Sequence, residues 1–452
     1  HVLRAYFYLQ LIKWYGNLPV LTEPIPVDYD YSKLRKNSFE ECARQIVADC
    51  DAAIASNNLP WRITSEVEIR RMTKAIACAI RSEASLWAAS PRFNDGKDLW
   101  EWAYQVNKES LDMLLSHGYE LYTHINNPSL YKTAYEEYFI ETADLRENPR
   151  DKETIWQGHQ KTASHFVIRG LPVQGGGYMA GAVPTQELVD AYDMLATGKP
   201  VLNLAKPYND ETKLQPNYNP GSGYDPQNPY EGRDPRFYAS IHFNGSTVLV
   251  NGTPIKVETF VGGNCGISND RSHTRTGYYN RKYMHPEAGQ LRPQDDGLWK
   301  HYRLGAVYLN AAEAAAQTGR TEEAMKYVNT IRHRAGFSPS VDIKANSKEE
   351  AVLYVRHERQ VELCYEEYRY FDTRRWCKPD EDNTCEKFST GMRITRNGDN
   401  TFSYQRVLVG TLSTETPSKM SYEKKYHLLP IPLDEVSKLE SQTGISWQNT
   451  GW

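Results

Sequence analysis

Apolar side chains recur at helical spacing in the first fifteen residues. Leu3, Phe7, Leu11 and Trp14 fall on one face of such a helix, so we expect this face to pack against the core. Gly16 to Pro19 combine two residues that end helices, and the helix should stop there. Residues 19–37 are rich in Pro, Tyr and Asp and are expected to form a loop.

Capping signals mark the next helices. Ser38 to Glu41 and Ser65 to Glu68 both read Ser-x-x-Glu, a capping box in which Ser accepts from an amide and Glu bonds back. The first box should start a helix that buries Phe39, and the second precedes a helix that stops at Ser90. Further helices are expected over residues 98–117 and, capped by Thr185, over a short stretch.

Residues 198–300 break the helical pattern. Pro, Gly, Asn, Asp and Tyr crowd this segment, with short strand-like pieces at 236–243 and 247–250. Asn244-Gly245 and Asn251-Gly252 are hairpin-turn signals. An irregular excursion of this length either carries function or is disordered, and its aromatic content disfavours disorder.

Helical periodicity returns near residue 300. Residues 304–315 and 324–331 form two apolar stripes separated by Gly319, a helix–turn–helix similar to one tetratricopeptide unit. Ser347 should cap a long helix that runs to about residue 376, and loop and strand should follow. We therefore predict a mainly α fold in one composite domain, 1–452. Its parts are a helical segment 1–197, the irregular excursion 198–300, the repeat-like and long helices 301–378, and a loop and strand tail 379–452.

Composition places the chain among ordinary globular proteins. The net charge is −4 and no Lys/Arg run stands out, which argues against a nucleic-acid-binding protein. No stretch approaches 18 apolar residues, so no membrane-spanning helix is predicted. Residues 1–15 carry Arg4 and Lys13 and lack a cleavage site, unlike a signal peptide. Because the chain begins at His1 inside a predicted helix, we expect an N-terminal part with any targeting signal to be missing.

The cysteines suggest no metal site. None of the seven forms a C-x-x-C pair, which disfavours a zinc ribbon or a thioredoxin-like motif. Cys42, Cys78 and Cys364 lie in helical patterns, as small buried apolar residues do. Cys377 and Cys385 are the one close pair that we consider for a disulfide.

Catalytic motifs are lacking. The sequence has no G-x-S-x-G elbow, no Walker loop, no H-E-x-x-H pair and no EF-hand loop. Glu366 and Glu367 are adjacent on the predicted helix and would point apart, so they are a poor glycosidase dyad. Glu358, Glu362, Glu366 and Arg369 share one helix face, which is more simply explained by salt bridges.

The predicted long helix carries the clearest family pattern. Arg356 to Leu363 together with Tyr368 to Trp376 resembles the signature helix of the SusD/RagB family of outer-membrane nutrient-binding lipoproteins. Further segments resemble this family's motifs in the family's order, with Thr450 where the family usually has Pro: residues 3–19, 88–94, 232–237 with 281–283, and 429–432 with 448–452.

This resemblance implies a SusD-like fold, with tetratricopeptide-like helix pairs on one side and the irregular excursion on the ligand-facing side. It implies no catalysis. It also implies an N-terminal lipid anchor at the bacterial cell surface, outside this sequence, and a partner: a SusC-like TonB-dependent transporter barrel that the protein caps as a hinged lid. No cofactor is expected, although a structural calcium would suit the Asp- and Asn-rich loops.

Tyrosine is unusually frequent, with 31 Tyr against 12 Phe. Glycan binding uses flat rings that stack on sugars, with amide, hydroxyl and guanidinium groups for the sugar hydroxyls. We therefore predict ligand contacts from aromatic and polar residues in irregular segments; for each, the alternative is that it fills a local loop core. The predicted set is Tyr29, Tyr31, Trp61, Tyr178, Tyr224, Asn269, Arg271 and His273, with His273 as a hydrogen-bond donor rather than a metal ligand.

The leading hypothesis is a non-catalytic protein that binds oligo- or polysaccharides at the cell surface. A peptide ligand on the same fold, as the RagB side of the family suggests, would use more backbone pairing. A polysaccharide hydrolase would release reducing ends. A helical-repeat scaffold would bind no small ligand.

Overall fold

The computed structural model describes residues 1–452. Excepted are residues 64, 66–67, 69, 141–150, 159–171, 173–178, 251, 269, 286–297, 380, 382–386 and 411–422. The fold is mainly α, as predicted, with a few short strands. The chain divides into two compact units, each described on its own below. Unit 1 comprises His1–Tyr119, Glu367–Cys385 and Ser421–Trp452, and unit 2 comprises Glu120–Glu366 and Glu386–Met420. The prediction of one domain with four parts is not tested by this division.

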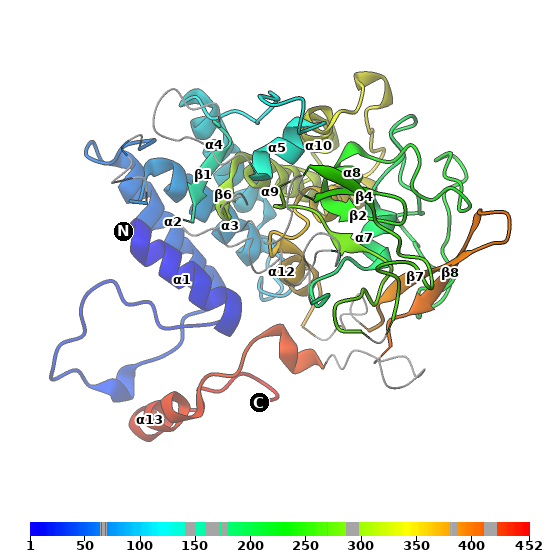
Figure 1. Ribbon diagram of the computed structural model, residues 1–452. Coiled ribbons are helices and arrows are strands. Elements are labelled where there is room, and N and C mark those ends of the chain that lie inside the picture. The colour runs from blue at the N-terminus through cyan, green and yellow to red at the C-terminus, as the bar shows by residue number, and fades with distance from the viewer. Residues whose placement is uncertain are drawn as a thin grey trace. The chain divides into compact units, whose positions relative to one another are not determined.

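Unit 1 is built on consecutive helices that pack against one another (Figure 1). They are α1 (Val2–Tyr15), α2 (Phe39–Ala55), α3 (Lys74–Ala89) and α4 (Trp100–Ser116). The later segments add α12 (Tyr368–Arg375) and α13 (Leu433–Thr443), with short 3₁₀ turns at Tyr31–Lys33 and Lys424–His427. Within the predicted loop and strand tail, α13 was not expected.

One of the two predicted capping boxes starts a helix and the other does not. The Ser38 box is present as predicted: the Ser38 hydroxyl accepts from the Glu41 amide, and the Glu41 carboxylate accepts from the Ser38 amide. Phe39 is buried behind it. The Ser65 signal does not start a helix, because α3 begins nine residues after Ser65 and Thr73 caps it. The predicted buried cysteines Cys42, Cys78 and Cys364 are all buried, and Cys385 of the predicted disulfide lies outside the described residues.

The buried face of α1 differs from the predicted one. Val2, Ala5, Leu9 and Ile12 are buried, whereas Leu3, Phe7 and Leu11 are 53%, 59% and 44% exposed. The reason lies in the composition of the helix, which is apolar around most of its circumference, so spacing alone could not select the face that meets α2 and α3.

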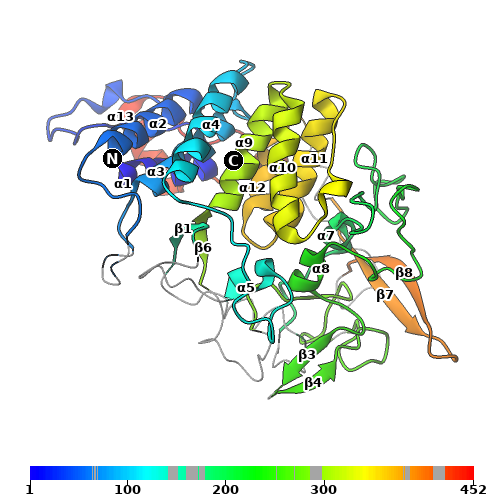
Figure 2. The same ribbon diagram turned by 90° about the horizontal axis from the view of Figure 1, so that it is seen from above.

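Unit 2 contains the repeat-like helices. Figure 2 shows α9 (Leu304–Gln317), α10 (Thr321–Ala335) and α11 (Lys348–Glu362) side by side. The predicted stripe Ala324, Met325, Val328 and Ile331 is buried along α10. Shorter helices are α5 (Ala134–Ile140), α7 (Gln186–Ala191) and α8 (Pro235–Ser240). A 3₁₀ turn spans Pro339–Val341.

The strands of unit 2 form two-stranded antiparallel ladders. These are β1 (Thr154–Gln157) with β6 (Lys300–Arg303), β2 (Ile241–His242) with β5 (Tyr279–Asn280), β3 (Thr247–Val250) with β4 (Thr253–Lys256), and β7 (Thr390–Arg396) with β8 (Phe402–Leu408). The predicted strand 247–250 and the hairpin that follows it are confirmed. The predicted strand 236–243 is wrong over most of its length, because Asp234 caps α8 and Pro235 occupies its first turn.

The long helix predicted to reach residue 376 ends at Glu362. Tyr365 and Glu367 take left-handed conformations, with φ of 59° and 67°, and α12 begins at the next residue. Basic and hydroxyl groups satisfy the carbonyls at this end: Arg303 and Tyr135 donate to Glu362 O at 3.1 and 2.8 Å. These long-range donors stabilise the break.

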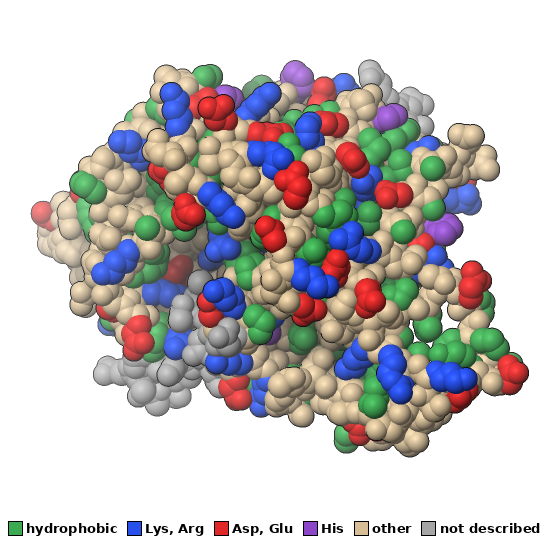
Figure 3. Space-filling view, turned by 180° about the vertical axis from the view of Figure 1, so that it is seen from behind, with side chains coloured by type: hydrophobic (Ala, Val, Ile, Leu, Met, Phe, Trp, Pro, Cys, Tyr) green, Lys and Arg blue, Asp and Glu red, His purple; other side chains and the backbone are tan. Residues whose placement is uncertain are grey.

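Acidic and basic side chains are interspersed on the face shown in Figure 3. No broad field of one sign dominates this face, in keeping with the balanced composition. No helix of the described ranges is long and apolar enough to cross a membrane.

Candidate ligand-binding surfaces

Three of the predicted ligand residues belong to unit 1. Tyr29 and Tyr31 meet edge to face, with ring centroids 5.2 Å apart, and Tyr31 is 36% exposed. The ring of Trp61 stacks on His117 with 3.6 Å between centroids, and Lys74 Nζ lies 5.8 Å from the same ring. Trp61 therefore already has a stacking partner within its own chain.

Three others belong to unit 2. Tyr224 packs with Tyr218 at 5.3 Å between centroids and lies 5.2 Å from the Arg233 guanidinium, and burial raises the pKa of Tyr224. His273 Nδ1 lies 2.8 Å from Ser268 Oγ. The side chain of Arg271 is exposed. Tyr178 and Asn269 lie outside the described residues.

The predicted set is thus divided between the two units. Among the described residues of the set, the recorded ring contacts join Tyr29 and Tyr31 alone. Their roles in ligand binding stay a prediction.

A hollow of about 230 Å³ lies in unit 2 between α11 and the loops at residues 200–205 and 219. Pockets that enclose a drug-sized ligand usually measure roughly 300–1,000 Å³. A smaller open hollow instead suits one part of a longer polymeric ligand. Its lining is Pro200, Leu202, Asn203, Leu204, Ala205, Asn219, Glu350, Leu353 and Tyr354. Leu202 also packs in the cluster that contains Tyr224, so this predicted residue adjoins the wall of the hollow without lining it.

The polar groups of the hollow retain bonding capacity. Asn203 Oδ1 accepts from the Ala205 amide at 3.0 Å, whereas no bond from its Nδ2 is recorded within the described ranges. Glu350 Oε2 accepts from the Asn346 amide at 2.7 Å, which leaves Oε1. The Tyr354 hydroxyl likewise has no recorded partner among the residues described, and burial raises its pKa. A half-buried ring therefore lies on the same hollow as an uncommitted amide and a carboxylate oxygen.

Sequence reasoning missed these groups. The spacing of apolar residues along the predicted long helix places Tyr354 on the same face as Val361, so periodicity alone predicts a buried ring. The structure leaves the ring half-buried, because the wall opposite is an irregular loop rather than a helix. Asn203 and Asn219 lie in the excursion that was predicted to face the ligand, but nothing in their local sequence separates them from ordinary turn residues.

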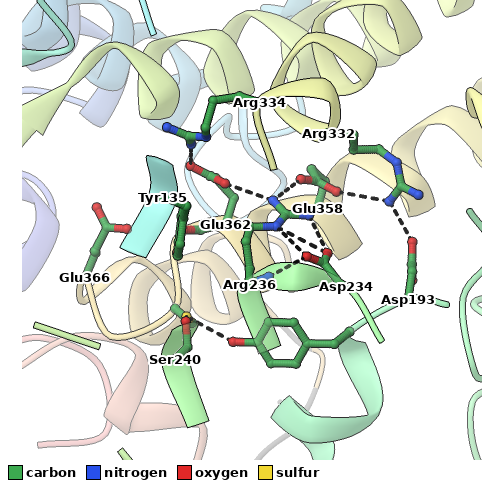
Figure 4. A network of polar contacts seen from close by, with 12 residues as sticks. Tyr135, Asp193, Asp234, Arg236, Ser240, Arg332, Arg334, Glu358, Glu362 and Glu366 are labelled. Carbon is green, nitrogen blue, oxygen red and sulfur yellow. Dashed lines mark hydrogen bonds and ion pairs between the residues drawn. The ribbon is translucent and has the colours of Figure 1, made fainter. Parts of the chain in front are cut away.

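Deeper in unit 2 lies a network of buried ion pairs (Figure 4). Arg236 contacts Asp234 at 2.7 Å and Glu362 at 2.8 Å. Glu366 contacts Arg303 at 2.7 Å and Lys282 at 2.8 Å. Further pairs are Arg332 with Asp193 at 2.6 Å and Arg334 with Glu153 at 2.7 Å.

These carboxylates are neutralised by their neighbours. Burial would raise the pKa of Glu362, but Arg334, Arg303 and Arg236 outweigh it and the pKa is lowered. Glu358, Glu362 and Glu366 do form salt bridges, but the predicted salt-bridged face of one helix is wrong: α11 ends at Glu362, and the partners of these acids come from other elements. Arg369 instead lies 5.9 Å from the Trp376 ring. A carboxylate held ionised by buried cations cannot donate a proton near neutral pH, so Glu362 is unsuited to act as a general acid.

No cluster of three or more potential metal-ligating side chains occurs in the described part of the chain. The expectation that the protein needs no cofactor is not tested by this observation.

The sequence profile of the SusD family matches residues 140–452. This span covers both the ion network and the repeat-like helices. The chain belongs to the SusD family. The motifs at 356–376, 232–237 and 429–432 lie within the matched span, and the resemblance inferred from them is confirmed. No curated protein sequence matches this SusD-family chain.

Solved structures agree on the fold. A SusD-like protein from Bacteroides fragilis is 24% identical, with a TM-score of 0.73, over 100% of this chain and 78% of that one. A SusD-like carbohydrate-binding protein from the same species is 19% identical, with a TM-score of 0.66, over 97% and 77%. Surface glycan-binding protein A from Bacteroides fluxus is 18% identical, with a TM-score of 0.56, over 100% and 77%. At these identities the similarity shows the fold.

Proposed function

We propose that this SusD-family protein captures oligo- or polysaccharide at the bacterial cell surface and passes it to a SusC-like TonB-dependent transporter, to which it is held as a lipid-anchored lid. The protein binds the glycan without cleaving it. Family membership supports the proposal, as do the similar folds of a carbohydrate-binding protein and a surface glycan-binding protein. The outer-membrane location, the anchor and the transporter partner rest on family membership alone.

The observation that carries the binding role is the hollow beside α11. Tyr354 supplies a half-buried ring and a hydroxyl, and Asn203 and Glu350 supply a donor and an acceptor. Sugar hydroxyls both donate and accept, so a mixed set of this kind matches them, while Leu202 and Leu353 cover the apolar face of a sugar ring. Because the hollow is open, the rest of a glycan chain can extend beyond it.

A non-catalytic role agrees with the chemistry of the carboxylates. The buried acids of the network are paired with guanidinium groups, and Glu350 on the hollow is a single carboxylate. Hydrolysis of a glycosidic bond by the usual route requires two carboxyl groups that face one cleft.

Affinity electrophoresis against a panel of neutral glycans and peptides tests this function. Tyr354→Ala and Asn203→Ala should each weaken retardation by about tenfold, with the melting temperature nearly unchanged. Tyr327→Ala, a half-buried ring on α10 that faces Tyr308 instead of the hollow, is the control and should bind as the parent does. If both hollow variants bind as strongly as the parent, the hollow is not the ligand site. Retardation by peptides alone would indicate the RagB-like alternative, and release of reducing ends would indicate a hydrolase.

A further inference from the structure

A larger cavity, of about 560 Å³, lies within unit 1. Its walls come from the turn after α1, the loop after α3, the segment 424–428 and the closing segment 448–451. Two glycines with left-handed backbone conformations lie where these segments meet. A Cβ on Gly16 would lie 2.9 Å from Leu428 Cδ1, and one on Gly451 would lie 2.9 Å from Lys425 Cβ. The cavity is therefore built by close backbone approaches that other residues would disturb.

The lining is strongly biased toward positive charge. Lys36, Arg92, Lys424 and Lys425 line the cavity against one carboxylate, Asp95. His427 adds an imidazole, and Phe93 and Leu428 add apolar surface. The whole chain carries a net charge of −4, so the local excess is not a reflection of composition.

Two of the lysines lack a counterion among the residues that the structure describes. Lys36 is half-buried and donates to Trp447 O at 2.6 Å; an ammonium has three N–H groups, so two remain. Burial lowers the pKa of Lys36, the direction expected where no carboxylate offsets desolvation. Lys424 is exposed and has no recorded hydrogen bond or ion pair within the described ranges. Lys425 differs, because Glu423 lies 3.2 Å from it.

Two of the amides in the lining are already committed. Gln448 bonds Ile431 in both directions, at 2.8 and 2.9 Å. Asn449 Nδ2 donates to Tyr15 O at 3.1 Å and Leu429 O at 2.7 Å. These side chains hold the wall in place, and among the charged donors of the lining Lys36 and Lys424 stay available to a ligand.

We propose that this cavity binds the carboxylate or sulfate group of an acidic oligosaccharide, with Lys36 and Lys424 contacting the oxyanion. The sugar part of this inference rests on the proposed function. A neutral sugar would leave the half-buried ammonium of Lys36 without a counterion, whereas an oxyanion accepts charge-assisted hydrogen bonds from both lysines. The volume of the cavity lies within the range that encloses a small organic ligand.

Isothermal titration calorimetry separates the possible ligands. The probes are trigalacturonate for a carboxylate, a sulfated carrageenan oligosaccharide for a sulfate ester, and galactotriose as the neutral counterpart. We expect at least one acidic probe to bind more tightly than galactotriose and to weaken as salt is raised. The acidic probe that binds more tightly identifies the oxyanion.

Lys424→Glu should weaken the acidic probe by at least about tenfold, because it reverses an exposed charge at the cavity without removing a packing contact. Lys36→Gln should weaken it as well; since this residue is half-buried, its melting temperature is measured in parallel. Lys438→Glu is the control: this exposed residue of α13 pairs with Glu435, does not line the cavity, and should leave affinity unchanged.

Equal affinity of parent and Lys424→Glu for the acidic probes would overturn the inference, and so would preference for galactotriose. If neutral glycans still bind and respond to Tyr354→Ala, the proposed function survives that failure. If no glycan of either kind binds, both the inference and the proposed function are wrong.

Discussion

Arg303 contacts Glu362 twice, through Nη1 to the Oε1 carboxylate oxygen at 2.8 Å and through Nη2 to the backbone oxygen at 3.1 Å. The same guanidinium therefore neutralises a buried charge and donates a hydrogen bond to the carbonyl at the end of α11. Since Arg303 lies at the junction of β6 and α9, this pair fixes where α11 ends relative to α9.

Removal of the Glu362 charge should be costly. In Glu362→Gln, Arg236, Arg303 and Arg334 would face a neutral amide in a site closed to water, and breaking such a pair costs about 3–5 kcal/mol. Urea unfolding followed by circular dichroism measures the loss. Glu435→Gln, whose exposed pair with Lys438 spans 2.9 Å, should cost less than about 0.5 kcal/mol. Similar losses for the two variants would contradict a stabilising role of the network.

Asp193 should make stability depend on acid pH. Burial would raise its pKa, but His357 and Arg332 outweigh burial and hold the pKa at about 2, below the usual 3.8. Because the folded state has the lower pKa, the contribution of Asp193 is fully present above about pH 4 and is lost as pH falls toward 2.

The measurement is the free energy of unfolding in urea at several pH values. The difference between the parent and Asp193→Asn should shrink by on the order of 2 kcal/mol between pH 4 and 2. Stability curves that run parallel across this interval would show that Asp193 is not the titrating group.

Local signals in the sequence were sufficient for several elements. The Ser38 box predicted the start of α2 to the residue, since both of its hydrogen bonds are made within one turn. The stripes around Gly319 predicted α9 and α10. α10 buries one face, whereas α9 is buried on nearly all sides and packs against both α10 and α11. The family motifs added the fold, which periodicity did not supply.

The break after Glu362 could not be predicted in this way. Periodicity continues through the break, and the residues that end the helix, Arg303, Tyr135 and Lys282, are distant in sequence. The hollow beside α11 was missed for a similar reason, since Asn203 and Tyr354 are 151 positions apart and meet only through the fold. Loop aromatics such as Trp61 were proposed for the ligand on local grounds, but the structure gives its ring a stacking partner in His117.

The Ser38 capping box should contribute measurably to unit 1. Ser38→Ala removes the acceptor for the Glu41 amide at 3.2 Å and should lower the free energy of unfolding by about 1 kcal/mol. Ser38→Gly should lower it by only about a few tenths of a kcal/mol. Thermal unfolding of both variants measures the difference. A loss of less than about 0.3 kcal/mol for Ser38→Ala would indicate that the hydrogen bond adds nothing at this end of α2.

The two faces of α1 should respond differently to truncation. Leu9 is fully buried against the neighbouring helices, and Leu9→Ala should cost about 2–5 kcal/mol through lost packing and a residual cavity. Phe7 is 59% exposed, and Phe7→Ala should change the free energy of unfolding by less than about 0.5 kcal/mol. Both residues lie in the middle of the same helix, and Leu and Phe differ in helix propensity by only about a few tenths of a kcal/mol, so a larger difference reports the face. The free energy of unfolding in urea measures both losses. A greater loss for Phe7→Ala than for Leu9→Ala would show that the face with Leu3, Phe7 and Leu11 is the buried one.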